Sequence, residues 1–301
     1  MNDGNLVVAI YSKYVKATEP SGGAIVLVGT PIGNLGDISK RALDTLEEAD
    51  LICCEDTRRT RKLLSSAGIT GKKLVTMEKH NERDITDYLV RSAQQGNLVA
   101  VVSDAGMPLL SDPGEHLVRT AYSSGVRVLV VPGPDSVTSA LVVSGIGTDR
   151  YCFEGFLPRR GVDRVRRLDD IAVNPCTVVI FESPRRVRST LADLARVCGE
   201  ERAVSVVREL TKVHEEIWRG NLEDACKWIE DRDNLLGEVV IVLAGNSHES
   251  EPVEEALVIE ALHQLLQEGV SVSAAVAEVS AQLGIAKRRA YSLALDLRKN
   301  S

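Results

Sequence analysis

The stretch AIVLVGTPIGNLGDISKRALDTLEEADLICC, residues 24–54, decides the fold class. It begins with a short apolar run, passes through a glycine-rich loop, continues with helical spacing over residues 38–49, and ends in a second apolar run at 51–54. Short apolar strands that alternate with helices are typical of a largely parallel sheet covered on both faces. The stretch therefore predicts a strand–helix–strand unit of an α/β domain.

The alternation of strand and helix continues to Ser144, and after that residue fewer helices separate the expected strands. In the second half, strands are expected at 151–156, 177–182, 203–209, 215–219 and 238–243, with helices expected only at 162–171 and 185–197. Fewer helices between the strands predict a mixed sheet, and hence a second α/β domain.

The chain is predicted to have five parts. They are a flexible leader (1–23), an N-terminal α/β domain (24–148), a C-terminal α/β domain (149–245), a polar linker (246–252) and a helical tail (253–301) with three short helices at 254–267, 272–282 and 287–297.

Composition narrows the function classes. The chain has 301 residues, 44% hydrophobic and 26% charged, which are ordinary values for a folded soluble protein. Its apolar runs are too short to cross a bilayer, and its N-terminus lacks the basic start and apolar stretch of a signal peptide. We therefore expect a cytoplasmic protein with no membrane partner. Cys53 and Cys54 are adjacent, and the histidines have no ligand spacing, so we expect neither disulfides nor a metal site.

The net charge of −7 disfavours a general polyanion binder, but the basic residues are clustered. One such cluster is usually a solvated helix face, whereas four together favour an anionic partner such as RNA. The clusters are Arg58, Arg59, Arg61 and Lys62; Arg159, Arg160, Arg164, Arg166 and Arg167; Arg185, Arg186 and Arg188; and Lys287, Arg288 and Arg289.

Three loops of the first half follow apolar strands, and ligands bind at the carboxyl ends of strands in open α/β sheets. The glycines of the first loop, residues 29–37, permit close backbone approach to a ligand. This loop does not fit G-x-G-x-x-G and lacks the lysine of a phosphate-binding loop. The alternative is a glycine-rich turn before a helix capped by Asp37 or Ser39.

The second loop, residues 102–115, contains two aspartates with different interpretations. Asp112, with Pro113 and Glu115 after it, is predicted to be the N-cap of the next helix. Asp104 has no such role and can accept hydrogen bonds from ribose hydroxyls, or it serves a local turn. The third loop, residues 131–136, is a stiff Pro-Gly-Pro bend that suits an adenine edge or a methionine carboxylate, or is a rigid turn capped by Asp135.

Taken together, these loops resemble one family. The chain is similar to the ribosomal small-subunit (16S rRNA) cytidine ribose 2′-O-methyltransferases of the tetrapyrrole-methylase superfamily, the class III methyltransferases. The motifs are Thr30-Pro-Ile-Gly-Asn-Leu-Gly-Asp37, Glu55-Asp-Thr-Arg58, His80-Asn-Glu82, Ser103-Asp-Ala-Gly106, Asp112-Pro-Gly114, Pro132-Gly-Pro134, Glu154-Gly-Phe-Leu-Pro158, Phe181-Glu-Ser183, Arg208-Glu-Leu-Thr-Lys212 and Gly237-Glu238. Met107 is a departure, because the family often has threonine there.

The resemblance implies two α/β domains with S-adenosyl-L-methionine in the cleft between them, a small helical tail and a homodimer. It implies methylation of a cytidine ribose in the decoding region of 16S rRNA within the small ribosomal subunit, and no metal. Corrin and porphyrin-precursor methylases of the superfamily carry a first loop like Gly-x-Gly-Pro-Gly-Asp. The sequence Gly29-Thr-Pro-Ile-Gly-Asn34 differs from it and favours the RNA branch.

The resemblance also assigns candidate residues. Those expected at the cofactor are Pro31, Ser103, Asp104, Ala105, Gly106, Met107, Pro132, Gly133, Ser136, Val137, Phe181, Leu210 and Val239. A ribose hydroxyl is a poor nucleophile, so a base or a cation near the forming alkoxide would help. The catalytic candidates are Glu55, Asp56, Arg58, Glu82, Glu209 and Lys212, each of which can instead be an ion-paired structural residue.

Two other functions stay open from the sequence. One is a small-molecule methylase, acting on a tetrapyrrole precursor, of the same superfamily. The other is a non-catalytic RNA- or DNA-binding module, in which residues 286–289 would open a recognition helix.

Overall fold

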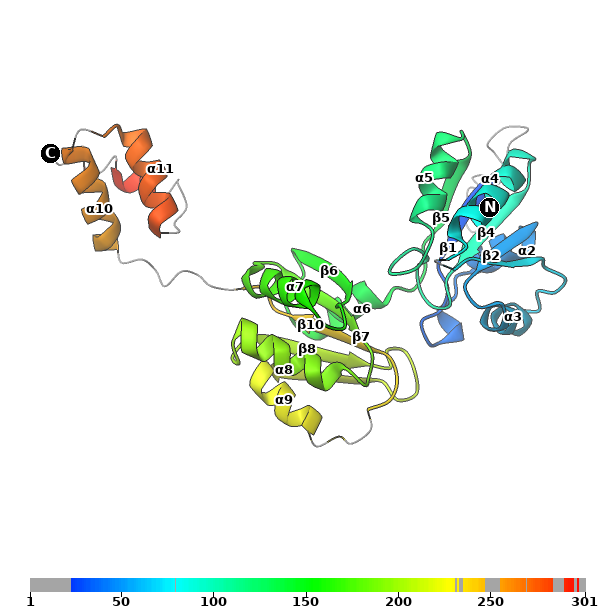
Figure 1. The fold of residues 1–301 in the computed structure, drawn as a ribbon. Helices are drawn as coiled ribbons and strands as arrows, with labels where there is room; N and C mark the ends of the chain where they lie inside the picture. Colours follow the sequence, from blue (N-terminus) through cyan, green and yellow to red (C-terminus); the bar gives the residue numbers. More distant parts are fainter. Residues whose placement is uncertain are drawn as a thin grey trace, which may run out of the picture. The chain divides into compact units, whose positions relative to one another are not determined.

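A computed structural model describes residues 23–78, 80–230, 232, 235–246, 255–268, 270–283, 290–294 and 297. The chain divides into two compact units, Met1–Gly245 and Asn246–Ser301. Figure 1 shows two sheets in the first unit and short helices in the second. No helix of the described part is both long and apolar enough to span a bilayer.

The first sheet has the strand order β3-β2-β4-β1-β5, and all its pairings are parallel, as predicted. Its strands are β1 (Ala24–Val28), β2 (Leu51–Cys54), β3 (Leu74–Thr76), β4 (Leu98–Val102) and β5 (Arg127–Val131). Its helices are α2 (Lys40–Glu48), α3 (Thr57–Ser66), α4 (Glu82–Gln94) and α5 (Glu115–Ser123), with a short 3-10 helix η1 (Leu35–Asp37) after the first loop.

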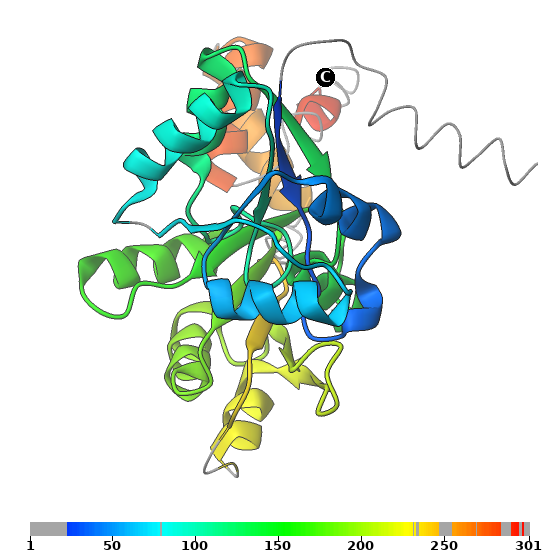
Figure 2. The ribbon, with the colours of Figure 1, turned by 90° about the vertical axis from the view of Figure 1, so that its right-hand side faces the viewer.

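Alternate side chains of these strands enter two separate cores, because neighbouring residues of a strand point to opposite faces. Val26 and Val28 pack with Leu46 of α2 and Leu64 of α3 on one face. Ile25, with Leu51 and Val99, packs against α4 and α5 on the other. Figure 2 shows these helix pairs on either side of the sheet. The covering of both faces explains why the strands are continuous apolar runs.

The second sheet has the order β6-β7-β10-β8-β9. Only β6 and β7 pair in parallel among its described strands, and the other pairings are antiparallel, so the predicted mixed sheet is confirmed. The strands are β6 (Tyr151–Phe156), β7 (Thr177–Glu182), β8 (Ala203–Arg208), β9 (Glu216–Asn221) and β10 (Val239–Leu243).

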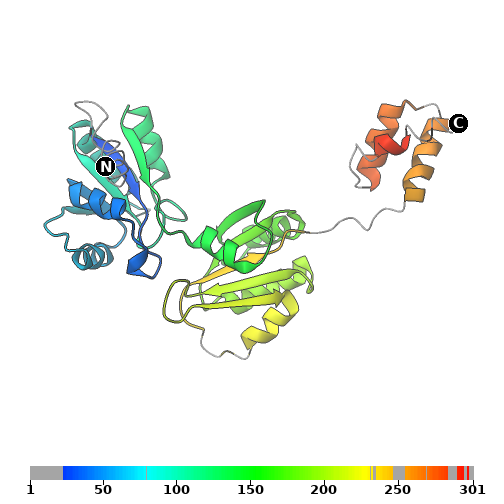
Figure 3. The ribbon, with the colours of Figure 1, turned by 180° about the vertical axis from the view of Figure 1, so that it is seen from behind.

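Helices cover both faces of this second sheet (Figure 3). The helices α7 (Val162–Val173), α8 (Val187–Cys198) and α9 (Leu222–Glu230) pack on one face. The helix α6 (Ser136–Ser144) follows β5 of the first sheet but packs on the other face of the second. Helix α9 was not predicted, although Leu222, Ala225 and Ile229 have the spacing of a buried helical stripe.

The second unit contains α10 (Glu255–Gln267) and α11 (Val272–Leu283), at two of the predicted helices. Their apolar faces form one small core around Val258, Leu262 and Val279, to which Ala290 and Ala294 also belong. The third predicted helix is described only at 290–294 and 297, where the residues are helical. The basic residues 287–289 and the predicted leader up to residue 22 lie outside the described residues.

Candidate active site

A cavity of about 380 Å³ lies where the loops of the two sheets of the first unit meet. From the first sheet it takes residues that follow β1, β2, β4 and β5, at the carboxyl ends of parallel strands where α/β sheets bind ligands. From the second sheet it takes the end of β7, the loop after β8 and the start of β10. The residues of this cavity that the sequence had pointed to are Glu55, Ser103, Asp104, Ala105, Ser136, Phe181, Leu210 and Val239.

The first, second and third loops pack directly on one another. The backbones of Thr30 and Gly106 exchange two hydrogen bonds, of 2.9 and 3.1 Å. A Cβ on Gly29 would lie 2.6 Å from the backbone nitrogen of Gly133 and 2.8 Å from the sulfur of Met107. Gly106, Met107 and Gly133 therefore set the loop packing behind the cavity, although they do not line it.

The remaining predicted cofactor residues also lie outside the cavity wall. Pro31 and Pro132 stand in the first and third loops and do not line it. Val137 is buried in the core under α6. Asp135 caps α6 by accepting from the backbone N–H groups of Val137 and Thr138, and so places Ser136 at the wall. The alternative reading of Asp135 as a cap is therefore correct, and Ser39 likewise caps α2.

Asp104 ties two loops together at the cavity wall. One carboxylate oxygen accepts a 3.0 Å hydrogen bond from the backbone N–H of Asp56, and the other lies 3.5 Å from the Nε of Arg59. The pKa of Asp104 is raised overall. Burial raises it by more than the hydrogen bond from Asp56 and the positive charge of Arg59 lower it. Its side chain is 23% exposed, so it remains accessible to a ligand in the cavity.

The prediction that Asp112 caps the next helix is wrong. The N-cap of α5 is Gly114, which has no side chain to do so. Instead the carboxylate of Glu82, on α4, accepts from the backbone N–H groups of Gly114 (2.9 Å) and His116 (3.2 Å). Asp112 is thus free to line the cavity, where it accepts a 2.5 Å hydrogen bond from Ser103. Sequence spacing could not show that a distant carboxylate takes over the capping.

Glu55 has the most perturbed carboxyl group of the cavity. It follows β2, lines the cavity, and its Oε1 is buried without a hydrogen-bond partner in the described structure. Burial, and then the negative charge of Asp112, raise the pKa of Glu55 to about 7. A carboxyl group with this pKa can take up and release a proton near neutral pH, as a general base must.

Glu209 and Lys212 form an ion-paired group with Glu238 on the second-sheet side. The Nζ of Lys212 lies 2.8 Å from Glu209 and 3.0 Å from Glu238. Burial raises the pKa of Glu209, but the hydrogen bonds from Lys212 and from the backbone of Glu238 outweigh it and leave the pKa below its ordinary value. A carboxylate of this kind is a poor base, so the group acts as fixed charge.

This ion-paired group also joins the two sheets. A Cβ on Gly33, in the first loop, would lie 2.4 Å from the Cγ of Lys212 and 2.8 Å from the hydroxyl of Thr211. Glu209 and Thr211 have φ values of 50° and 65°, in the left-handed region that non-glycine residues rarely adopt. Such strain is typical of binding loops that the surrounding structure holds in place.

Arg58 and Asp56 are placed further from the cavity. Asp56 caps α3 by accepting from the backbone N–H of Arg58. The Arg58 side chain is 89% exposed and does not line the cavity, whereas its neighbour Arg59 does.

Phe181, Leu210 and Val239 make an apolar wall on the second-sheet side. Phe181 packs edge-to-face against Phe153 and Phe156, with ring centroids 4.7 and 5.6 Å apart. Phe156 also lines the cavity but was not predicted. The sequence feature that could have identified Phe156 is its place as a large aromatic residue at the end of a strand, within the motif Glu154-Gly-Phe-Leu-Pro158.

The cavity fits S-adenosylmethionine. Its volume lies within the ~300–1,000 Å³ of small-molecule sites, which combine apolar walls with a few convergent polar groups. Phe181, Leu210 and Val239 give the cavity an apolar wall, and Asp104 and Asp112 bring carboxylate acceptors to it. Glycines let three loop backbones approach closely around this space. Among the described residues, no group of His, Cys, Asp and Glu is arranged to hold a metal ion.

Comparisons with known proteins show the class to which the chain belongs. Residues 24–226 match the family described as "Tetrapyrrole (Corrin/Porphyrin) Methylases", and residues 251–298 match the "RsmI C-terminal HTH domain". Uroporphyrin-III C-methyltransferase from Thermus thermophilus, solved with S-adenosyl homocysteine, has the same fold, with a TM-score of 0.52 at 21% identity over 74% of this chain and 97% of its own. The fold and the first match place the chain in the tetrapyrrole-methylase class.

Curated relatives narrow this class. "Ribosomal RNA small subunit methyltransferase I" of Synechocystis is 39% identical over 91% of this chain and 98% of its own length. The protein of the same name from Escherichia coli O157:H7 is 39% identical, covering 94% and 99%, and that from Thermotoga maritima is 45% identical, covering 74% and 99%. The chain belongs to the ribosomal RNA small subunit methyltransferase I family. This membership confirms the predicted family, the enzyme class and the cofactor, S-adenosylmethionine.

Proposed function

We propose that this enzyme transfers the methyl group of S-adenosylmethionine to the 2′-hydroxyl of a cytidine ribose in the decoding region of 16S rRNA, and so works in the cytoplasm. The relatives' shared name and the two matched regions support a ribosomal RNA substrate. The observation that carries the chemistry is Glu55 in the cavity, whose buried Oε1 has no hydrogen-bond partner among the described residues and whose pKa is raised to about 7 by burial and by Asp112.

The bound cofactor supplies an electrophilic methyl carbon, because its sulfur is a sulfonium. The chain's own task is to hold the two substrates in line and to exclude water, which in ideal cases lowers the barrier by ~7–11 kcal/mol. Asp104 and Asp112 would hold the ribose of the cofactor, with Phe181, Leu210 and Val239 against the adenine. Ser136, at the N-terminus of α6, would meet the carboxylate of the cofactor, because the first turn of a helix favours negative charge.

Glu55 would act as the general base. When the 2′-oxygen of the acceptor takes the methyl group and the methyl carbon–sulfur bond breaks to leave a neutral thioether, the hydroxyl proton would pass to a carboxylate oxygen of Glu55. Burial and Asp112 make this transfer favourable because they raise the pKa of Glu55 towards neutrality. Lys212 does not line the cavity, and Glu209 and Glu238 already neutralise its charge, so we assign it no catalytic role.

We also propose that the enzyme is a homodimer that pairs through the edge of the first sheet. β5 is an edge strand, and Leu129 and Val130 are 45% and 51% exposed. Their side chains point to opposite faces of the sheet, so each face of this edge carries an exposed apolar side chain. Val142 on α6 is another exposed apolar side chain of this unit, 69% exposed. Sedimentation should give a dimer for the wild type and a monomer for Leu129→Asp, and a wild-type monomer would contradict the proposal.

A substrate comparison tests the proposed reaction. Small ribosomal subunits from a strain that lacks its own copy of this methyltransferase should accept labelled methyl groups from S-adenosylmethionine. Uroporphyrinogen should not, because it offers carbon instead of a ribose hydroxyl. Methylation of uroporphyrinogen without methylation of the subunits would favour a small-molecule methylase.

A further inference from the structure

We propose that a second groove beside the cavity binds the acceptor strand of the RNA, with one phosphate held by Arg159 and Arg185 and one base stacked on Phe156. The inference rests on the proposed function, because it names where the nucleic acid enters the site.

The groove continues from the cofactor cavity. It is lined by residues 156–159 and 183–186, and it shares Phe156, Ser183 and Pro184 with the cavity. These two segments follow β6 and β7, which pair in parallel, so both loops leave the sheet at the same edge. A strand of RNA in this groove would therefore present a ribose to the cavity without crossing another part of the fold.

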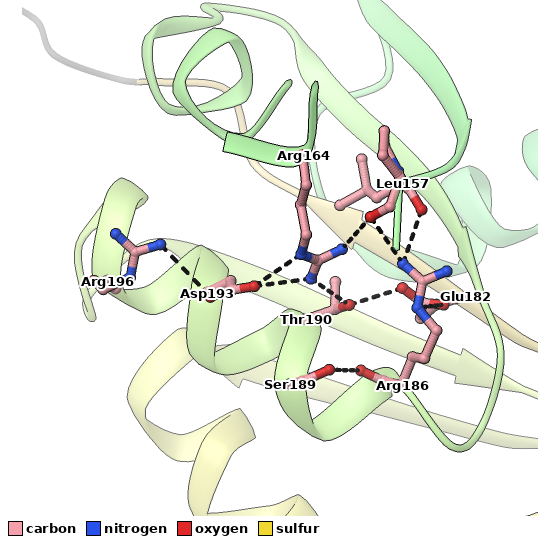
Figure 4. A network of polar contacts seen from close by, with 9 residues as sticks. Leu157, Arg164, Glu182, Arg186, Ser189, Thr190, Asp193 and Arg196 are labelled. Atoms are coloured by element: carbon pink, nitrogen blue, oxygen red, sulfur yellow. Dashed lines mark hydrogen bonds and ion pairs between the residues drawn. The ribbon is translucent and has the colours of Figure 1, made fainter. Parts of the chain in front are cut away.

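Two other arginines hold these loops in place (Figure 4). Arg186 donates to the carbonyl of Leu157 at 2.8 Å and lies 3.4 Å from the buried carboxylate of Glu182. Arg164, only 8% exposed, donates to the carbonyl of Pro158 at 3.0 Å and pairs with Asp193 at 2.9 Å.

Thr190 completes the clamp. It accepts from Arg164 at 3.1 Å and donates to Glu182 at 2.7 Å, so both loops belong to one connected network (Figure 4). Arg164 and Arg186 thus bind partners within the protein. The number of basic residues in these sequence clusters is therefore larger than the number available to contact RNA. Arg167 and Arg188 are likewise engaged, Arg167 with Glu154 and Arg188 with two backbone carbonyls at the C-terminal end of α9.

Arg159 and Arg185 are different. Both are exposed, both line the groove, and neither has a hydrogen-bond or ion-pair partner among the residues that the structure describes. Each projects from a loop that the clamp holds. A guanidinium presents a planar fork of donors that matches the oxygens of a phosphate, and a preorganised one loses little freedom on binding. The pair is suited to a phosphodiester.

Phe156 supplies the apolar part of the groove. Its side chain is 57% exposed although the ring rests against Phe181. A large aromatic ring that is supported from below and open above is a stacking platform for an unpaired base. The base of one nucleotide would then stack on Phe156, and its ribose would lie at the mouth of the cavity. Its phosphate would contact the two arginines.

The test compares two double variants of the full-length enzyme. Arg159→Gln with Arg185→Gln removes the groove charges, and Arg160→Gln with Arg166→Gln removes the same charge from exposed arginines that do not line the groove. For the first variant we expect the KM for small subunits to rise on the order of tenfold and the salt slope of binding to fall by about 0.7 for the lost phosphate contact. The affinity for S-adenosylmethionine, measured by calorimetry without RNA, should stay unchanged.

Phe156→Ala should weaken subunit binding on the order of tenfold, and Phe156→Tyr should restore it because tyrosine also stacks. Equal effects of the two arginine variants on KM would overturn the inference. So would a loss of cofactor affinity in the groove variant, because the arginines would then bind the cofactor's carboxylate. If the wild type itself transfers no methyl group to subunits, the proposed function fails. If the wild type is active but the variants behave as just described, only the proposed RNA groove fails.

Discussion

The substitution Glu55→Gln gives two linked predictions, for stability and for rate. Glutamine keeps the shape of the side chain and cannot ionise. The rise of the Glu55 pKa from 4.5 to about 7 corresponds to about 3 kcal/mol against the ionised form, at about 1.4 kcal/mol for each pKa unit. Because the group is only partly buried, solvent screening reduces this to about 1–2 kcal/mol.

The sign follows from proton linkage. A carboxyl group whose pKa is higher in the folded than in the unfolded state contributes stability below pH 4.5 that is lost as the pH rises through about 7. Between pH 4.5 and 8 the wild type should therefore lose about 1–2 kcal/mol of unfolding free energy relative to Glu55→Gln. Urea titrations of both proteins at several pH values measure this difference. Parallel stability curves over the whole range would refute the shifted pKa.

The rate prediction uses the same group. The kcat/KM of the wild type should rise tenfold per pH unit below about pH 7 and level off above it. Glu55→Gln should be slower by about 10²–10⁴-fold at neutral pH, without that rise. Asp112→Asn is the matched control, because it removes the neighbouring negative charge and should move the inflection below pH 7. A Glu55→Gln enzyme with the wild-type rate and pH profile would contradict the assignment of the base.

Other parts of the chain give further expectations. Asp104→Ala should weaken S-adenosylmethionine binding in calorimetry, because it removes a cavity acceptor and the tether to the backbone of Asp56; unchanged affinity would remove Asp104 from the site. Arg164→Met should destabilise the first unit by about 1–3 kcal/mol, because it removes the donor to the carbonyl of Pro158 and to Thr190 and an ion-pair partner of Asp193; a melting temperature equal to the wild type would show that the clamp is dispensable. Ending the chain at Asn246 should preserve the melting transition of the first unit and cofactor binding but lower activity on subunits, since the division into units falls there; full activity would show that the tail is not needed.

The elements of the fold were predictable where local pattern and burial agree. β1, β2 and β4 are buried on both faces, so their apolar runs marked them clearly. Helix α9 was missed although its buried positions have helical spacing, because only Leu222, Ala225 and Ile229 mark the stripe and charged residues stand between them. The sheet on which α6 packs could not be predicted, since the sequence of the helix does not show that it follows one sheet and packs on the other.

The site was predictable only in part, for a physical reason. Loops after parallel strands meet at one edge of a sheet, so Asp104, which follows β4, could be expected at a ligand site from the sequence. The role of Asp112 depended on which carboxylate caps α5, and Glu82 does so from another helix. Likewise, Arg164 and Arg186 looked like RNA-binding residues, and only the burial of Glu182 and the partner Asp193 shows that they serve the fold.

The most direct test of the central claim is to locate the transferred methyl group. Small subunits from a strain lacking this methyltransferase would be incubated with the enzyme and labelled S-adenosylmethionine, and the 16S rRNA would be hydrolysed with alkali. A methyl group on a 2′-oxygen blocks cleavage at that nucleotide. The account predicts that the label appears in one alkali-resistant dinucleotide whose first base is cytosine, from the decoding region. Label in ordinary mononucleotides, on a base, would contradict it.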